Sequence, residues 1–151
     1  GDVLEVSGPA QATYSYGAPA SEATSTLNPA SDDDVVVNTP TDYGNSYPVG
    51  QCTWGVKELA PWASNWWGNA NTWAIYASAQ GYRVGNVPVV GAIAVWDGGE
   101  YGHVAYVTDV QSENSIQVLE ANYRRQKQIA NYRGFFNPHE FLGRVTYIYP
   151  N

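Results

Sequence analysis

Four residues in the later part of this sequence have the side-chain chemistry needed to cleave an amide bond. Cys52 is the single cysteine of the chain and stands in YPVGQCTW, directly before a predicted helix. His103 is one of two histidines, and Glu120 and Asn122 lie together in LEANY. A thiol attacks a carbonyl carbon, an imidazole takes the thiol proton, and a carboxylate or amide fixes the imidazole.

The position of Cys52 at the start of a helix favours a nucleophile. The helix N-terminus carries a partial positive charge that stabilises a thiolate. The backbone N–H of Cys52 would also be placed to donate to an oxyanion. A buried cysteine without a chemical role remains the alternative, so the prediction depends on a base within reach.

His103 is the better candidate for that base. It follows EYG and opens a predicted strand, so its backbone is fixed and its ring is available. His139 lies in the turn-like stretch NPHEF, and no cluster of further His, Cys or carboxylate residues frames a metal around it. We therefore expect His139 to be a surface residue.

A predicted hairpin brings the polar partners to His103. Strands 103–110 and 115–121 are joined by the four-residue loop QSEN, so the numbers of paired residues sum to 225. His103 then lies opposite Asn122, with Glu120 on the same face because side chains alternate along a strand. A register slip of one residue would separate them, and a slip of two would keep them on one face.

The elements around these residues predict an α+β fold, with helices first and an antiparallel sheet after them. A helix is predicted over 52–60, ended by Pro61, and a second over 71–80, with Gly81 as its C-cap. Strands are predicted at 91–97, 103–110, 115–121 and 144–150. The stretch 122–136 is ambiguous, and a hairpin or strand–loop–strand is favoured.

Composition divides the chain into an acidic linker, residues 1–42, and a catalytic domain, residues 43–151. The first 46 residues hold seven acids and no Lys or Arg, so they carry the whole net charge of −7. Their Ala, Ser, Thr and Pro content is typical of a tether, although DDDVVV (32–37) could add a strand. The sequence has no basic nucleic-acid footprint and no apolar run of membrane-spanning length.

The chain also lacks a signal peptide and contains no Met, which indicates a processed fragment whose upstream modules are missing.

Three motifs in order, YPVGQCTW, GAIAVWDGGEYGHVAYV and IQVLEANY, resemble the CHAP domain, the cysteine- and histidine-dependent amidohydrolase/peptidase of bacterial cell-wall enzymes. The Trp-rich LAPWASNWWGNANTWA resembles secreted streptococcal cell-separation hydrolases of the PcsB type. The resemblance implies a papain-like (NlpC/P60-type) fold, in which helices carrying the Cys pack on an antiparallel sheet carrying the His.

The resemblance also implies roles: Cys52 as nucleophile, His103 as base, and Glu120 followed by Asn122 completing the site. The expected substrate is peptidoglycan, cut as an N-acetylmuramoyl-L-alanine amidase or as an endopeptidase of stem peptide or cross-bridge. Wall remodelling, daughter-cell separation or lysis would follow, outside the cell or in its wall, with other wall or division proteins as partners through upstream modules. No cofactor is expected, because the calcium site of some phage relatives is not matched near Cys52.

A second group of residues is expected to contact substrate. Flat aromatic rings suit a cleft for sugar and peptide, and residues just before the nucleophile suit oxyanion or substrate support. These candidates are Tyr47, Gln51, Trp62, Trp66 and Trp67. The alternatives are that some of the Trp residues belong to the core and that Tyr47 with Pro48 only orders the turn into the helix.

Two other functions stay open on the sequence. A non-catalytic wall-binding or adhesion module could retain the fold and the aromatic residues, although it would not need a thiol. A cysteine transferase could use the same dyad on another amide. Alkylation of the thiol at mildly acidic pH and turbidity loss of purified walls would distinguish them.

Overall fold

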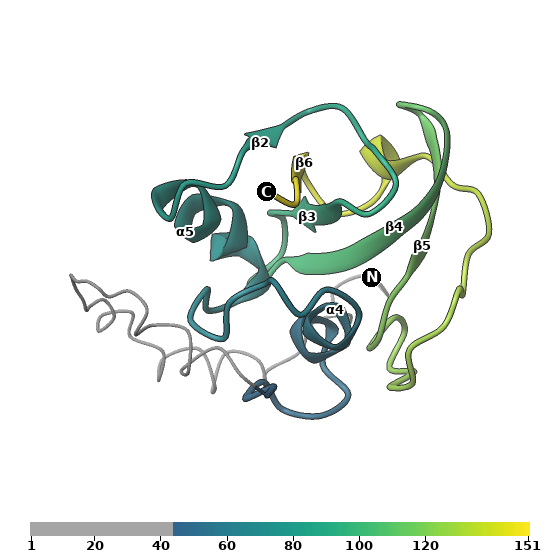
Figure 1. Ribbon diagram of the computed structural model, residues 1–151. Coiled ribbons are helices and arrows are strands. Elements are labelled where there is room, and N and C mark those ends of the chain that lie inside the picture. Colours follow the sequence, from purple (N-terminus) through teal and green to yellow (C-terminus); the bar gives the residue numbers. More distant parts are fainter. Residues whose placement is uncertain (1–43) are drawn as a thin grey trace.

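The computed structural model describes residues 44–151, which form a five-stranded antiparallel sheet and two α-helices (Figure 1). The stretch DDDVVV and most of the predicted linker lie outside the described residues. The strand order is β2-β6-β3-β4-β5. The elements are α4 (Cys52–Leu59), η2 (Ala70–Thr72), α5 (Trp73–Ala79), β2 (Val84–Gly85), β3 (Ile93–Trp96), β4 (His103–Ser112), β5 (Ser115–Leu119), η3 (Pro138–Glu140) and β6 (Val145–Ile148).

The predicted α+β class is confirmed, and so are its main elements. Helix α4 agrees with the prediction to within one residue, and Gly81, with φ 98°, follows α5 in the left-handed conformation expected after a helix. The second predicted helix divides into the 3₁₀ turn η2 and α5. The short strand β2 and the turn η3 were not predicted, because two or three residues carry no periodic signal.

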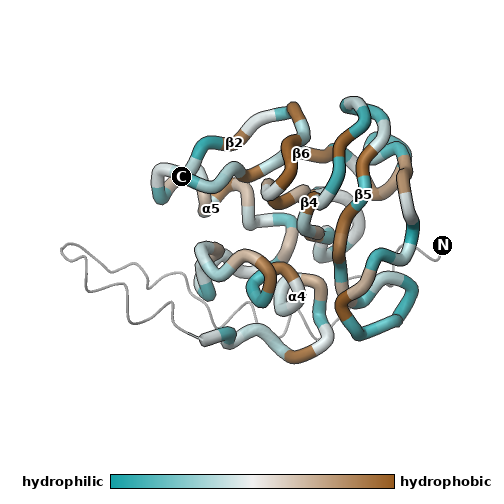
Figure 2. Tube along the Cα trace, turned by 45° about the vertical axis from the view of Figure 1, so that its right-hand side comes forward, coloured by the Kyte–Doolittle hydropathy of each residue, from teal (hydrophilic) through white to brown (hydrophobic). Residues whose placement is uncertain are grey.

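The two faces of the sheet bury different side chains. Ile93, Val95 and Val104 pack with α4 and α5. Trp96 of β3 and Tyr147 of β6 lie in a second apolar cluster on the opposite face, because side chains alternate along each strand. Figure 2 shows the hydrophobic residues concentrated along these strands and along one side of α4. The sheet therefore has a core on each face, and α4 belongs to only one of them.

The hairpin of β4 and β5 (side by side in Figure 1) differs from the prediction at its turn and agrees with it at its far end. The loop was expected to span four residues, but β4 continues to Ser112, which pairs with Ser115. Two β-bulges then follow, and each adds one unpaired residue to β4, the first between 107 and 109 and the second between 110 and 112. Beyond them Tyr106 pairs with Leu119, in the predicted register.

The ambiguous stretch 122–136 doubles back along the outer side of β5. It makes single bridges, Glu120 with Ala130 and Ile116 with Phe136, and a tight bridged turn at Tyr123. No regular strand forms there, so the predicted hairpin or strand–loop–strand is wrong, although the segment does pair with β5 through single bridges. This return places the segment around 130–136 beside the end of β5.

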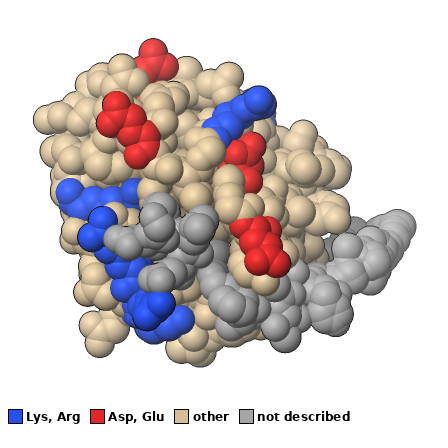
Figure 3. Space-filling view, turned by 180° about the vertical axis from the view of Figure 1, so that it is seen from behind, with Lys and Arg blue, Asp and Glu red and all other residues tan. Residues whose placement is uncertain are grey.

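The surface shows charges of both signs. On the face seen in Figure 3, most Lys and Arg atoms gather along one edge, and the Asp and Glu atoms lie apart from them. Within residues 44–151, no helix is long and apolar enough to cross a membrane.

Candidate active site

The centre of the candidate site is a hydrogen bond between His103 and Glu120. His103 Nε2 lies 2.9 Å from Glu120 Oε1, and both side chains are fully buried. His103 opens β4, and Glu120 follows the last residue of β5, so the hairpin register brings them together. Trp96, opposite His103 on β3, packs its ring 5.8 Å from the imidazole. The imidazole is therefore held by a carboxylate and an aromatic wall.

Cys52 lies on the other side of the imidazole, at the first residue of α4. Burial alone would lower the pKa of His103, but the negative charge of Cys52, its hydrogen bond and the Glu120 carboxylate together raise that pKa. His103 Nδ1 is buried and is the ring nitrogen that Glu120 leaves open. With Nε2 committed to Glu120, Nδ1 is the nitrogen that can exchange a proton with the thiol.

Glu120 is held by a second residue that the sequence did not reveal. Arg133 donates to both carboxylate oxygens, from Nε to Oε2 at 2.9 Å and from Nη2 to Oε1 at 2.7 Å. Burial alone would raise the pKa of Glu120, but hydrogen bonds and charge from Arg133 and His103 lower it. The one sequence signal was indirect: a buried carboxylate needs a cation, and Arg133 stands among aromatic residues in NYRGFF.

Asn122 is in the site, but its side chain does not bond to His103. Its Nδ2 donates to Gln51 Oε1 at 3.1 Å, and both residues are buried. The backbone of Asn122 has φ 58°, a left-handed conformation that turns the chain away from the strand direction. The β4–β5 ladder ends at the Tyr106–Leu119 pair, so the expected pairing of Asn122 directly across from His103 does not form.

The bond to Asn122 gives Gln51 a defined orientation. Gln51 directly precedes the thiol residue, and its amide oxygen is occupied as an acceptor. Its amide N–H groups are then the part left to act as donors, which suits the oxyanion support expected from the sequence.

Close packing of α4 against the end of the hairpin sets the thiol beside the imidazole. Gly55 lies one turn after Cys52, and a Cβ added there would stand 2.9 Å from the Cβ of Ala121. Only a glycine permits this approach without displacement of the helix. Ala121 lies between Glu120 and Asn122, so the contact joins the two halves of the site.

The aromatic candidates for substrate contact divide into two groups. Tyr47 and Trp67 lie in the core, with 2% and 0% exposure, and Tyr47 donates its hydroxyl to Ser64 O at 2.7 Å. Trp62 and Trp66 are half-buried, and Trp62 stacks on Tyr82 with 5.5 Å between ring centroids. The placement of Tyr47 and Trp67 favours the core alternative, whereas Trp62 and Trp66 keep faces that a ligand can reach.

The other histidine lies away from these residues. His139 is exposed in η3, as expected. Within residues 44–151, no group of three His, Cys, Asp or Glu side chains is arranged to hold a metal ion.

Comparisons with known proteins find similar chains. A family model described as "CHAP domain" matches residues 42–122, more than half of the chain. A "Putative hydrolase" of Streptococcus mutans is 60% identical over 109 residues, 71% of this chain and 52% of that protein. The "Staphylococcal secretory antigen SsaA" of Staphylococcus epidermidis is 42% identical over 113 residues, 74% of this chain and 44% of the relative.

Two further matches carry the name of an activity. "N-acetylmuramoyl-L-alanine amidase sle1" of Staphylococcus aureus is 44% identical over 101 residues, 64% of this chain and 30% of the relative. The crystal structure of an N-acetylmuramoyl-L-alanine amidase from Staphylococcus aureus superposes with a TM-score of 0.59 and 30% identity, covering 70% of this chain and 31% of that one. The chain thus spans about half the length of these curated relatives, or less.

Proposed function

Because the chain belongs to the CHAP domain family, we propose that it hydrolyses an amide bond of peptidoglycan with Cys52 as nucleophile and His103 as base. The observation that carries this proposal is the placement of one buried imidazole between a thiol at a helix start and a carboxylate. That order of groups is the one that nucleophilic acyl transfer needs. A module that only binds cell walls has no use for it.

The proposed reaction has two stages. His103 Nδ1 takes the thiol proton, Cys52 Sγ bonds to the substrate carbonyl carbon, and the carbonyl oxygen becomes an oxyanion. The imidazolium then returns that proton to the leaving nitrogen as the C–N bond breaks, which leaves a thioester. His103 next takes a proton from water, whose oxygen bonds to the thioester carbon. As the C–S bond breaks, the imidazolium returns this proton to the Cys52 sulfur and the carboxylic acid product is released.

The supporting residues have separate tasks in this scheme. Glu120 holds Nε2–H and stabilises the imidazolium, because a carboxylate interacts with a cation more strongly than an amide does. The backbone N–H of Cys52 and the amide of Gln51 are proposed to stabilise the oxyanion, with Asn122 fixing Gln51. Trp62 and Trp66 are the proposed aromatic contacts to sugar or peptide.

The bond is proposed to lie in the stem peptide, in the cross-bridge, or between the stem peptide and N-acetylmuramic acid. The names of two matched amidases support the last of these. Action outside the cell or in its wall is also proposed, and the "secretory antigen" relatives support it. Wall remodelling, daughter-cell separation or lysis are the biological roles that such a reaction would serve.

The test is digestion of purified peptidoglycan, with mass spectrometry of the products. Release of intact stem peptides from the glycan identifies an amidase, whereas shortened stems or opened bridges identify an endopeptidase. The Cys52→Ala variant should release neither while it keeps the circular dichroism spectrum of the parent. Wall binding without any product from the parent protein would instead support the adhesion-module alternative.

A further inference from the structure

We propose that Arg133 is a positioning residue of this site. It neutralises the buried Glu120 carboxylate, so that the positive charge of His103 can stabilise the Cys52 thiolate. This inference rests on the proposed function, because it concerns the active charge state of the same residues. Arg133 acts through Glu120 and is not proposed to touch substrate.

The contact between Arg133 and Glu120 is a complete two-point ion pair. The two N–H···O distances are 2.9 and 2.7 Å, and the side chains are 8% and 0% exposed. Oε1 receives both Arg133 Nη2 and His103 Nε2, so one oxygen joins the guanidinium to the imidazole. A bidentate arginine fixes the plane of a carboxylate as well as its charge.

Aromatic rings hold the guanidinium in place. The Arg133 Cζ atom lies 4.0 Å from the ring centroid of Phe141, 4.1 Å from that of Phe136 and 4.2 Å from that of Tyr123. Phe141 also packs edge-on against the His103 ring, at 5.7 Å. Cation–π contact of this kind attracts a guanidinium in a space where water is scarce. The rings that surround Arg133 are therefore shared with the site, so its position is tied to that of the imidazole.

The balance of charges explains what Arg133 adds. In the reactive state the thiolate and imidazolium carry opposite charges, and so do Glu120 and Arg133, so the four buried groups sum to zero. Without Arg133 the same state would leave one net negative charge in a poorly solvated space, which is costly. The imidazolium would then pair with Glu120 alone, and less of its positive charge would stabilise the thiolate.

Other titratable groups face this cluster from the same return segment. Tyr132 precedes Arg133, and burial together with the negative charge of Glu120 raises its pKa, so its phenol stays neutral at physiological pH. Lys127 packs its side chain over Gly50, just upstream of the thiol residue. Neither residue can replace a guanidinium that donates to both oxygens of Glu120, because that geometry belongs to arginine.

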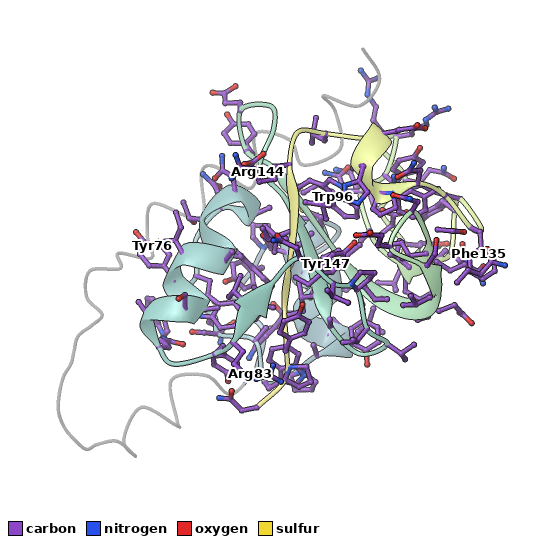
Figure 4. All side chains as sticks on the ribbon, turned by 90° about the horizontal axis from the view of Figure 1, so that it is seen from above. Tyr76, Arg83, Trp96, Phe135, Arg144 and Tyr147 are labelled. Atoms are coloured by element: carbon purple, nitrogen blue, oxygen red, sulfur yellow. The ribbon has the colours of Figure 1, made fainter. Side chains whose placement is uncertain are left out.

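The direct test measures the alkylation rate of Cys52 by iodoacetamide between pH 4 and 9, followed by mass spectrometry of the intact protein. We expect Arg133→Gln to move the midpoint of the rate profile upward by about one pH unit or more, which corresponds to a roughly tenfold loss of thiolate at acidic pH. Arg133→Lys keeps the charge but not the two-point geometry, so its midpoint should lie between those of the parent and of Arg133→Gln. Arg83→Gln is the matched control, because Arg83 is an exposed arginine over the Tyr149 ring and away from the site (Figure 4).

A double variant separates the proposed charge effect from a general structural one. In Glu120→Gln with Arg133→Gln no carboxylate needs to be neutralised, so the midpoint should return toward the parent value and no buried unpaired charge should prevent folding. A purely structural role for Arg133 predicts no such rescue. If the Arg133→Gln variant fails to fold alone, the double variant is compared with Glu120→Gln. Glu120→Gln leaves the guanidinium as an unpaired positive charge, so its midpoint should lie below that of the double variant. Coincident profiles would overturn the charge role.

Hydrolysis is measured in parallel, so that the two proposals can fail separately. Arg133→Gln should lower kcat on peptidoglycan at pH 6 by about tenfold or more, with little change in KM, because the residue acts on the reacting groups and not on substrate binding. If the parent protein cuts no peptidoglycan while the alkylation profile of Arg133→Gln is still shifted from that of the parent, the proposed function is overturned and the role of Arg133 stands. A folded Arg133→Gln variant with the parent profile would overturn the role of Arg133.

Discussion

His103 is the residue on which the chemistry of the site converges. Its two ring nitrogens are distinguished by their surroundings, since Nε2 is bonded to Glu120 and Nδ1 is left for the Cys52 thiol. A neutral imidazole with its proton on Nε2 is then the form that can accept the thiol proton. Glu120 and Asn122 differ accordingly, because only Glu120 touches this ring.

We expect Glu120→Ala to lower the hydrolysis rate more than Asn122→Ala does. Glu120→Ala removes the charged partner of His103 and leaves Arg133 unpaired, so a loss of about a hundredfold or more in kcat is expected. Asn122→Ala disturbs only the orientation of Gln51, so a loss of about tenfold is expected. Initial rates on one peptidoglycan preparation decide the order, with circular dichroism as the folding control, and a larger loss for Asn122→Ala would contradict it.

The ionisation of Glu120 and His103 should make the stability of the folded protein depend on pH. The pKa of Glu120 is lowered in the folded protein, so its contribution is fully present above the ordinary value of 4.5 and is lost as the pH falls from there through the folded value. The pKa of His103 is raised above 6.5, so its contribution is present below 6.5 and is lost as the pH rises through the folded value.

Melting temperatures between pH 3 and 9 measure both effects. The Glu120→Gln variant should lose less of its melting temperature than the parent when the pH falls from 5 to 3. An equal fall in the two proteins would show that other carboxylates set the acid limit.

At the scale of elements, the contact between α4 and the hairpin decides whether thiol and imidazole meet. Gly55 faces Ala121 across this contact, where an added Cβ would be 2.9 Å away. Helix α4 would have to move outward to accept a larger residue, and the Cys52 thiol would move with it. Geometry at the reacting atoms is sensitive to displacements of this kind.

Gly55→Ala should therefore lower both stability and rate, the stability by roughly 1–3 kcal/mol for an overpacked contact. The compensating variant is Gly55→Ala with Ala121→Gly, which removes the opposing Cβ and should recover most of both losses. Denaturant unfolding and initial rates measure the two effects. Failure of the second substitution to restore either quantity would show that the loss does not come from this contact.

The sequence allowed α4, α5 and the four longer strands to be predicted, because their apolar residues are periodic and Pro61 and Gly81 mark the helix ends. It also placed Glu120 near His103, but through a four-residue loop that the structure lacks. With a two-residue turn and no bulges, pairing would slip by two residues, about 7 Å along the strand. The two bulges in β4 correct that slip, and bulges leave little trace in a hydrophobic pattern.

Arg133 could not be predicted for a related reason. It reaches Glu120 only because the chain doubles back after β5, and it does so through single bridges and not through a strand. Residues that meet through irregular backbone have no fixed spacing in the sequence. Gln51 was a candidate from its place beside the thiol, but its bond to Asn122 depends on a left-handed turn that Asn tolerates better than most residues.

At the scale of the whole molecule, the site lies where the two cores of the sheet meet. Cys52 belongs to the core beneath the helices, whereas Trp96, which packs on His103, belongs to the core on the opposite face. Figure 4 shows Trp96 and Tyr147 within the molecule and Tyr76 and Arg83 at its margin. Both cores and all the residues of the candidate site described above lie within residues 44–151.

We therefore expect a shortened protein that begins at Tyr43 to keep the melting temperature and the hydrolysis rate of the full chain. Residues 1–42 carry all seven of the net negative charges and have the composition of a tether, and we propose that they serve as one. Calorimetry and rates on solubilised peptidoglycan compare the two forms. A fall of several degrees in melting temperature would show that the acidic segment packs on the domain, with DDDVVV as the first stretch to examine.

The complete burial of Cys52, whose exposure is 0%, also bears on how this thiol would survive at the proposed place of action outside the cell. A disulfide requires two sulfur atoms about 2.05 Å apart, and no second protein can bring its thiol that close to a sulfur beneath the surface. Covalent dimers should therefore be absent from protein kept in air, on a non-reducing gel. Small oxidants such as hydrogen peroxide remain able to enter, so inactivation should begin with a sulfenic acid that added thiol reverses.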